Sequence, residues 1–120
     1  MRENFLVKLP REIGQCHELR VIDVSFNRLS TLPRTIGELH QLHTLNVNHN
    51  HLENLPMELG ECKRLQRLSA TSNNLVELPI EDLAEIETLR LVDARHNPKL
   101  TLSRENSELL PPSVELLLHD

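Results

Sequence analysis

Apolar residues recur along this chain in a pattern that repeats every 23 positions. Leucine, isoleucine and valine follow the unit L-x-x-L-x-L-x-x-N-x-L-x-x-L-P-x-x-I-G-x-L-x-x between charged and polar residues. The Leu-Pro dipeptide marks the period, and it occurs at positions 9–10, 32–33, 55–56 and 78–79. Four copies with this many matched positions indicate a repeat architecture.

Each unit contains a short stretch in which apolar and variable residues alternate, as they do in a half-buried strand. In the first such stretch, Ile22 and Val24 are expected to point into the core. The side chains that alternate with them are expected to point outward: Val21, Asp23 and Ser25. One strand per unit, always in the same direction, predicts a parallel sheet.

Proline and glycine recur at fixed positions in the second half of the unit. Pro33 and Pro56 suit the start of a short extended or helical turn on the outer face. The glycines at 14, 37 and 60 are expected to permit the bend that follows. The unit therefore predicts a coil with a strand on one side and a turn on the other.

The unit resembles the leucine-rich repeat, whose signature is L-x-x-L-x-L-x-x-N-x-L. Its L-P-x-x-I-G continuation resembles the 23-residue subclass of intracellular Ras-pathway scaffolds, plant intracellular Ras-group proteins and Scribble- or Erbin-like proteins. The match covers about residues 4–102. This resemblance implies an α/β solenoid with a concave parallel sheet and short helical or extended turns on its convex side.

The resemblance also implies a role for one asparagine per unit, at positions 4, 27, 50, 73 and 97. Their buried amides are expected to satisfy backbone groups of neighbouring coils, because buried amides need hydrogen-bond partners. The asparagines would then form a ladder through the stack.

The organisation is one leucine-rich-repeat domain over residues 1–120. It has four recognisable repeats near 9–102, a partial repeat at 1–8 and an atypical partial repeat at 103–120. The fourth repeat carries one extra residue between Pro79 and Leu89, and it has Asp82 where earlier repeats have an apolar residue. Residues 111–114 are expected to lead into another strand that runs to 119–120. Since solenoids usually carry polar caps and none is evident at the N-terminus, adjoining repeats or another domain are expected there.

Composition narrows the classes of partner. A net charge of −5 and 2% aromatic residues argue against binding to nucleic acid phosphates or bases. No apolar stretch approaches the roughly 20 residues that span a bilayer, and the charged N-terminus is unlike a signal peptide. We therefore predict a cytoplasmic protein that neither binds nucleic acid nor inserts into a membrane.

Two cysteines, Cys16 and Cys62, align with Leu39, an inward-facing position of the outer turn. They belong to coils two steps apart, so their separation is expected to be roughly 10 Å if coils are spaced like strands. A disulfide needs Cα atoms within about 7 Å. We predict two buried free thiols, in agreement with a reducing compartment.

The sequence His49–Asn50–His51 offers three interpretations: a metal half-site, a nuclease-like cluster, or two rim side chains beside a structural asparagine. A catalytic zinc site takes about three protein ligands, and His96 is two coils away. A nuclease also needs a basic groove for phosphate. We therefore predict no metal, no cofactor and no catalytic residue, and a protein that is not an enzyme.

The remaining surface is the outward side of the sheet and its edge. In the family these positions vary to recognise protein partners. Phe26 is expected to neighbour Arg28, His49 and His51 across one coil step, and aromatic and arginine residues are enriched at interface hot spots. The candidate protein-binding residues are Asp23, Phe26, Arg28, Asn46, Asn48, His49, His51, Arg67, Asp93 and Arg95.

By resemblance, the expected function is a protein–protein interaction scaffold in signal transduction. The partner class would be a small GTPase, a phosphatase or another signalling complex. Two alternatives stay open: a structural spacer of a longer repeat array, or the targeting arm of an enzyme whose catalytic domain lies elsewhere.

Overall fold

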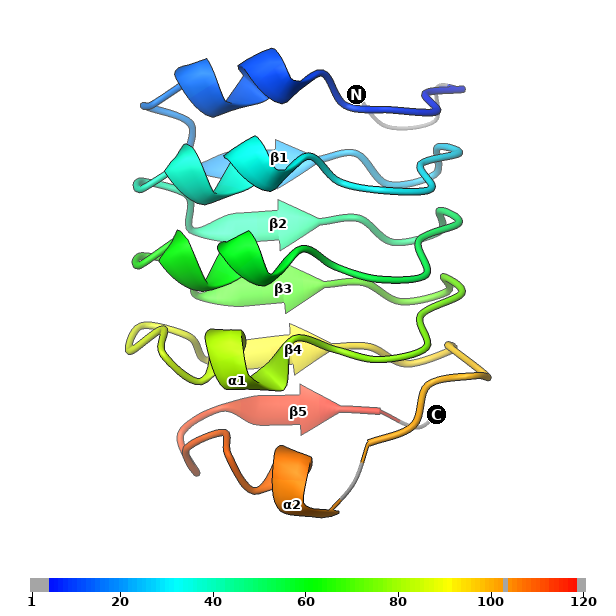
Figure 1. Cartoon of the computed structure of the whole chain (residues 1–120), viewed down its shortest axis with the longest axis vertical. Coiled ribbons are helices and arrows are strands. Elements are labelled where there is room, and N and C mark those ends of the chain that lie inside the picture. The colour runs from blue at the N-terminus through cyan, green and yellow to red at the C-terminus, as the bar shows by residue number, and fades with distance from the viewer. Residues whose placement is uncertain (1–4, 103, 119–120) are drawn as a thin grey trace.

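The computed structural model describes residues 5–102 and 104–118, which form a stack of coils (Figure 1). Each complete coil contributes a strand to one face of the stack and a short helical turn to the opposite face. The strands are β1 (Val21–Asp23), β2 (Thr44–Asn46), β3 (Arg67–Ser69), β4 (Leu91–Asp93) and β5 (Glu115–Leu117). The turns are 3₁₀ helices η1 (Arg11–Gln15), η2 (Arg34–Glu38) and η3 (Met57–Glu61), then α1 (Ile80–Leu83) and α2 (Arg104–Ser107).

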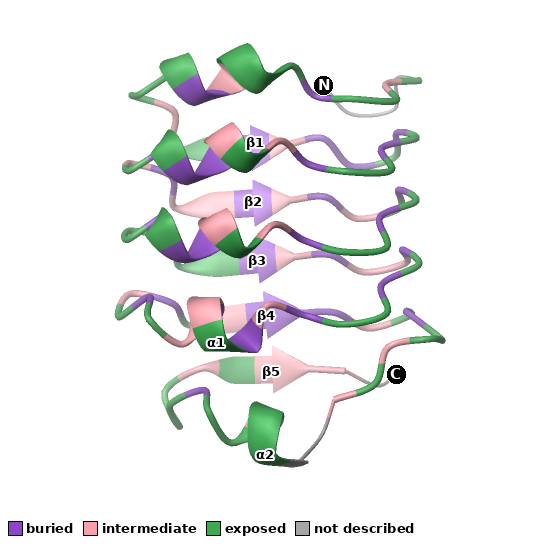
Figure 2. Cartoon of the chain, in the orientation of Figure 1, coloured by how far each residue is buried: buried purple, intermediate pink, exposed green. Residues whose placement is uncertain are grey.

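The strands form one parallel sheet in the order β1-β2-β3-β4-β5. This confirms the predicted leucine-rich-repeat solenoid. The pairing keeps equivalent repeat positions side by side, so that Ile22 pairs with Leu45 and Leu45 with Leu68. The core is a continuous cluster of buried apolar side chains from the strands, the helical turns and the segments that connect them. Figure 2 shows buried residues on the strands and on the helical turns that face them.

A proline precedes each of the first three helical turns, as expected. Pro10, Pro33 and Pro56 have φ angles of −69°, −70° and −69°, which suit a residue at a helix start. The extra residue of the fourth repeat changes the type of turn. It allows the Ala84 N–H to donate to the Ile80 carbonyl at 2.9 Å, a bond of the α-helical kind.

The α-helical turn also keeps Asp82 out of the core. Ile80 and Leu83 are the buried residues of α1, whereas Asp82 is half-buried. The insertion is therefore absorbed without placing a carboxylate among the leucines.

The glycines serve a purpose other than the predicted one. No glycine of the described chain has a positive φ angle, so none is required for an unusual bend. A Cβ atom on Gly37 would lie 2.6 Å from the Glu58 carbonyl oxygen of the next coil, and one on Gly14 would lie 2.7 Å from that of Thr35. Close packing of adjacent helical turns excludes a side chain at these positions.

The prediction of two buried thiols is right for Cys62 and wrong for Cys16. Cys62 is fully buried, and its thiol donates to the Ile36 carbonyl of the preceding coil at 3.2 Å. Cys16 belongs to the first coil of the described chain, where no preceding coil covers the equivalent position, and it is exposed. Both cysteines are free.

The atypical C-terminal repeat does form the expected strand, because β5 pairs with β4. The polar segment before it contains α2, which is tied to α1 only loosely compared with the tight packing of η1, η2 and η3 (Figure 1). The expected ladder residue Asn4, together with Ser103, His119 and Asp120, lies outside the described residues. Among the residues that are described, no helix is long and apolar enough to cross a membrane.

Candidate functional site

The ladder asparagines are buried and fully engaged. The Asn50 Oδ1 atom accepts from the Leu29 N–H of the preceding coil at 3.0 Å. Its Nδ2 group donates to the carbonyls of Val24 at 3.1 Å and Val47 at 3.0 Å. Asn27, Asn73 and Asn97 are buried in the same way. This confirms the predicted ladder, and it leaves the Asn50 amide without a part in surface chemistry.

The residue before each of these asparagines has a left-handed backbone, which the sequence analysis missed. The φ angles are 58° at Phe26, 57° at His49, 54° at Ser72 and 60° at His96. This conformation is unfavourable for a residue with a Cβ atom. Backbone hydrogen bonds to the next coil hold it, as from Phe26 N–H to the Asn48 carbonyl at 2.9 Å. The sequence offered one signal for this conformation: the same repeat position always comes directly before the ladder asparagine and its turn. Two of the four residues there are histidines, and histidine tolerates the left-handed region better than most residues.

These four residues form a row along one edge of the sheet, which we call the left-handed row: Phe26, His49, Ser72 and His96. The rings of Phe26 and His49 stack with their centroids 4.2 Å apart and their planes 11° apart. Phe26 is still 43% exposed. The predicted proximity of Phe26 and His49 is therefore confirmed.

Arg28 and His51, also predicted beside Phe26, have their described contacts with other residues. The Arg28 guanidinium lies over the Phe5 ring, 4.5 Å from its centroid, in a cation–π contact. His51 is exposed, and its N–H donates to the Leu29 carbonyl at 2.8 Å. Arg67 is exposed on β3, on the outward side of the sheet.

Polar side chains at the strand ends cap the backbone two residues further on. The Asp23 Oδ1 atom accepts from the Ser25 N–H at 3.0 Å, and the Asn46 Oδ1 atom accepts from the Asn48 N–H at 3.0 Å. Such local bonds are the usual way in which Asp and Asn stabilise turns. Ser25 also donates its hydroxyl to Asp23 at 2.6 Å and is only 2% exposed, so its predicted exposure is wrong.

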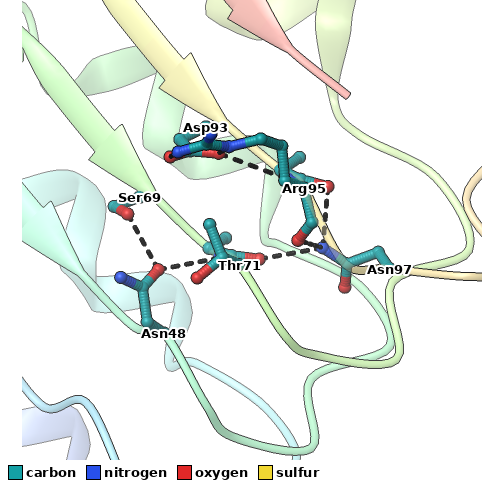
Figure 3. A network of polar contacts seen from close by, with 8 residues as sticks. Asn48, Ser69, Thr71, Asp93, Arg95 and Asn97 are labelled. Atoms are coloured by element: carbon teal, nitrogen blue, oxygen red, sulfur yellow. Dashed lines mark hydrogen bonds and ion pairs between the residues drawn. The ribbon is translucent and has the colours of Figure 1, made fainter. Parts of the chain in front are cut away.

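The third coil has a serine at this capping position, and the preceding coil supplies the missing acceptor (Figure 3). The Asn48 Oδ1 atom accepts from the Thr71 N–H at 2.7 Å and from the Ser69 hydroxyl at 2.8 Å. Asn48, predicted as a contact residue, therefore also fixes the backbone of its neighbour.

In the fourth coil the capping residue is Asp93, which forms an ion pair with Arg95 (Figure 3). The Arg95 Nε and Nη2 atoms donate to its two carboxylate oxygens at 2.9 and 2.8 Å. These bonds hold the pKa of Asp93 below its usual 3.8, although burial acts in the opposite direction. Asp93 is only 8% exposed, so this outward position is covered.

Beside the left-handed row, the sheet face is hollowed at Ser72, the smallest member of the row. The hollow has a volume of about 450 Å³. Its lining residues come from three coils: Asn48, His49, Thr71, Ser72, Asp93, Arg95 and His96. In residues 5–102 and 104–118, no three His, Cys, Asp or Glu side chains gather closely enough to hold a metal ion.

The family described as "Leucine-rich repeat region" matches residues 1–116. The chain belongs to the leucine-rich-repeat family. Members of this family are generally protein–protein interaction modules and are typically not enzymes. A search of curated proteins gives no match.

Solved structures of other proteins are similar to this chain over most of its length. A leucine-rich-repeat protein of Leptospira interrogans is 30% identical, with a TM-score of 0.81 over 95% of this chain and 29% of its own length. The plant peptide hormone receptor RGFR1, in complex with RGF2, is 22% identical, with a TM-score of 0.78 over 94% of this chain and 19% of its own. The second likeness shows the fold alone. The chain spans less than a third of either protein.

Proposed function

We propose that this leucine-rich-repeat segment is a non-enzymatic protein-binding module whose partner lies on the concave sheet and along the Phe26–His49 edge. The observation that carries the proposal is the exposed aromatic stack. Phe26 is 43% exposed yet held by a fixed backbone and by the His49 ring. A preorganised aromatic anchor loses little side-chain freedom on binding, which favours affinity.

The neighbouring sheet supplies the rest of the proposed contact area. Val21 is 60% exposed on β1, and Arg67 is exposed on β3. Among the proposed contact residues, Asp23, Asn46, Asn48, Asp93 and Arg95 are held by hydrogen bonds at the strand ends. The surface presented to a partner is therefore rigid, and its recognition rests on shape as well as on charge. Arg28 and His51, which directly follow the ladder asparagines Asn27 and Asn50, extend the proposed contact area.

The proposed setting is a cytoplasmic signalling scaffold. Two free cysteines fit a reducing compartment. The LPxxIG subclass resemblance favours a small GTPase, a phosphatase or another signalling complex as the partner.

The test compares capture of partners from extracts of the source cells by three forms of the chain. The wild type is expected to capture at least one protein saturably, and the double variant Phe26→Ala/His49→Ala is expected to lose at least tenfold in affinity. Met57→Ala is the control, because Met57 is 63% exposed on the opposite, helical face. Phe26→Asn/His49→Asn provides a second form, since asparagine tolerates the left-handed backbone.

Equal affinity of the wild type and a folded double variant would show that the partner does not contact Phe26 and His49. No saturable capture by any form would favour the spacer role or the targeting-arm role.

A further inference from the structure

The hollow beside Ser72 has more hydrogen-bond donors available to a ligand than acceptors. Its most strongly accepting atoms are already used within the protein. The Asn48 Oδ1 atom accepts two hydrogen bonds, from Thr71 N–H and the Ser69 hydroxyl. Both carboxylate oxygens of Asp93 accept from Arg95.

The donors of the hollow are less committed. A backbone N–H only donates, so the Thr71 N–H fixes the Asn48 amide with its oxygen inward. The Asn48 Nδ2 group is consequently directed away from this bond, and it donates no hydrogen bond within the described residues. The hydroxyl groups of Thr71 and Ser72 also line the hollow and can donate.

The row of left-handed residues gives the hollow its walls. His49 and His96 stand on either side of Ser72 in the row, one coil step away in each direction. The His49 backbone is tied to the next coil by the bond from its N–H to the Thr71 carbonyl at 2.9 Å. A ligand seated over Ser72 would lie between His49, whose ring stacks on Phe26, and His96.

From this surplus of donors we propose that the hollow binds the carboxylate of an Asp or Glu side chain of a partner protein, beside the contact at Phe26. The proposal rests on the proposed function and names the chemistry that the partner must present. An ionised carboxylate only accepts hydrogen bonds and offers about four lone-pair sites, which match the amide and hydroxyl donors.

The charges of the hollow favour a carboxylate over a phosphate group. The one arginine that lines it is paired with Asp93, with 2.8 Å between Arg95 Nη2 and Asp93 Oδ2. Apart from the two histidines, the formal charges of the lining residues cancel, because Arg95 and Asp93 are the other charged ones. A phosphate group carries up to two charges near neutral pH and is suited to an unpaired arginine fork.

The experiment titrates the isotope-labelled chain with acetyl-Gly-Glu-Gly-amide at constant ionic strength and follows it by NMR. The neutral probe acetyl-Gly-Gln-Gly-amide has the same shape and serves as its control. The expected dissociation constant of the Glu probe is on the order of 10 mM, the range reached by very small ligands. The shifts should be saturable and concentrated on the Asn48 side-chain amide and the backbone amides of Thr71 and Ser72.

Asn48→Asp is the informative variant, because it keeps the inward oxygen and replaces the outward donor with a second acceptor. It should lose at least tenfold in affinity for the Glu probe. Asn54→Asp adds the same charge at an exposed position outside the hollow and should bind as the wild type does.

Equal shifts with the Glu and Gln probes would overturn the proposal, as would no shift at several times the expected dissociation constant. So would unchanged binding by Asn48→Asp. These titrations contain no partner protein, so the hollow can fail while capture through Phe26 and His49 succeeds. Loss of capture with an intact hollow would instead contradict the proposed function.

Discussion

At the residue scale, equivalent positions of the repeat differ in their chemistry because their neighbours differ. The two cysteines show this most simply. Cys62 is fully buried, whereas Cys16 at the same repeat position is exposed. Burial, together with the nearby Glu61 carboxylate, raises the pKa of Cys62 to about 11.

We predict that iodoacetamide at pH 8 alkylates Cys16 in the native chain and leaves Cys62 intact. Only about one Cys62 thiol in a thousand would be ionised at that pH, and the thiolate is the reactive form. Intact-mass spectrometry should show one adduct under native conditions and two in denaturant. Rapid addition of two adducts to the native chain would contradict the burial of Cys62.

The left-handed backbone at Ser72 predicts an unusual order of stability among substitutions. Ser72→Gly relieves the steric penalty and should be neutral or stabilising by up to about 1 kcal/mol. Ser72→Val should destabilise by about 1–2 kcal/mol, because β-branched residues fit this region poorly. Chemical denaturation measures both.

Ser30 is the matched control, because it is exposed and its φ angle is not positive. There the glycine variant should be the less stable of the two. If the glycine variant were more stable than the valine variant at both positions, or less stable at both, the left-handed backbone at Ser72 would have no effect on the free energy of unfolding.

The ion pair of Asp93 and Arg95 predicts a dependence of stability on pH. The pKa of Asp93 is lowered in the folded chain, so its stabilising effect is present above its usual 3.8 and is lost as the pH falls through the lowered value. Asp93→Asn should cost about 1 kcal/mol at pH 7, a modest figure because the Arg95 side chain is 42% exposed. Urea unfolding across pH 2–7 should show the wild type and the variant converging at the acid end. A difference that is constant with pH would contradict the role of the charge.

At the element scale, adjacent helical turns approach so closely that a glycine is required between them. Gly37→Ala places a Cβ atom 2.6 Å from a backbone carbonyl oxygen, and a backbone atom of the next coil cannot move aside without moving the coil. We predict a loss of about 2–3 kcal/mol in the free energy of unfolding. Glu38→Ala, on the exposed side of the same turn, should change it by less than about 0.5 kcal/mol. Equal effects of the two variants would show that the turns can separate without loss.

The repeat pattern was enough to predict the strands, the helical turns and the asparagine ladder, because the position of each of them is set by residues within its own coil. Strand positions such as Ile22, the prolines before the turns and the ladder asparagines all carry local signals. The extra residue in the fourth repeat was visible as well. Its conversion of a 3₁₀ turn into an α-helical turn was not, because that outcome depends on which neighbouring side chains fill the core.

The candidate site was only partly predictable, because its details arise between coils and from side-chain conformations. The proximity of Phe26 and His49 follows from the repeat alignment and was expected, whereas the stacking of their rings was not predicted. The cap that Asn48 provides for the next coil follows from Ser69 being too short to supply the usual acceptor. The burial of Asp93 depends on Arg95 lying across it. The Asn48 cap requires the geometry of two coils at once, whereas the pairing of Asp93 with Arg95 lies within one coil and requires the side-chain conformation of Arg95.

At the scale of the whole molecule, the chain is a row of coils that gain their stability from one another. The asparagine ladder and the shared core connect each coil to the next, as in other solenoids. The result is a fixed sheet face with one aromatic edge. The proposed function depends on this face, and not on the helical turns of the opposite side.

The most direct test of that claim is site-specific photo-crosslinking in extracts of the source cells. The aromatic photo-crosslinker p-benzoylphenylalanine replaces Phe26 in one form of the chain and Met57 in another, since Phe26 is exposed in the left-handed row and Met57 is exposed on the helical turn η3. The proposal predicts a discrete protein adduct from position 26 that is absent from position 57 and is competed by unlabelled wild type. The same adduct from position 57, or none from position 26, would contradict a partner on the concave face.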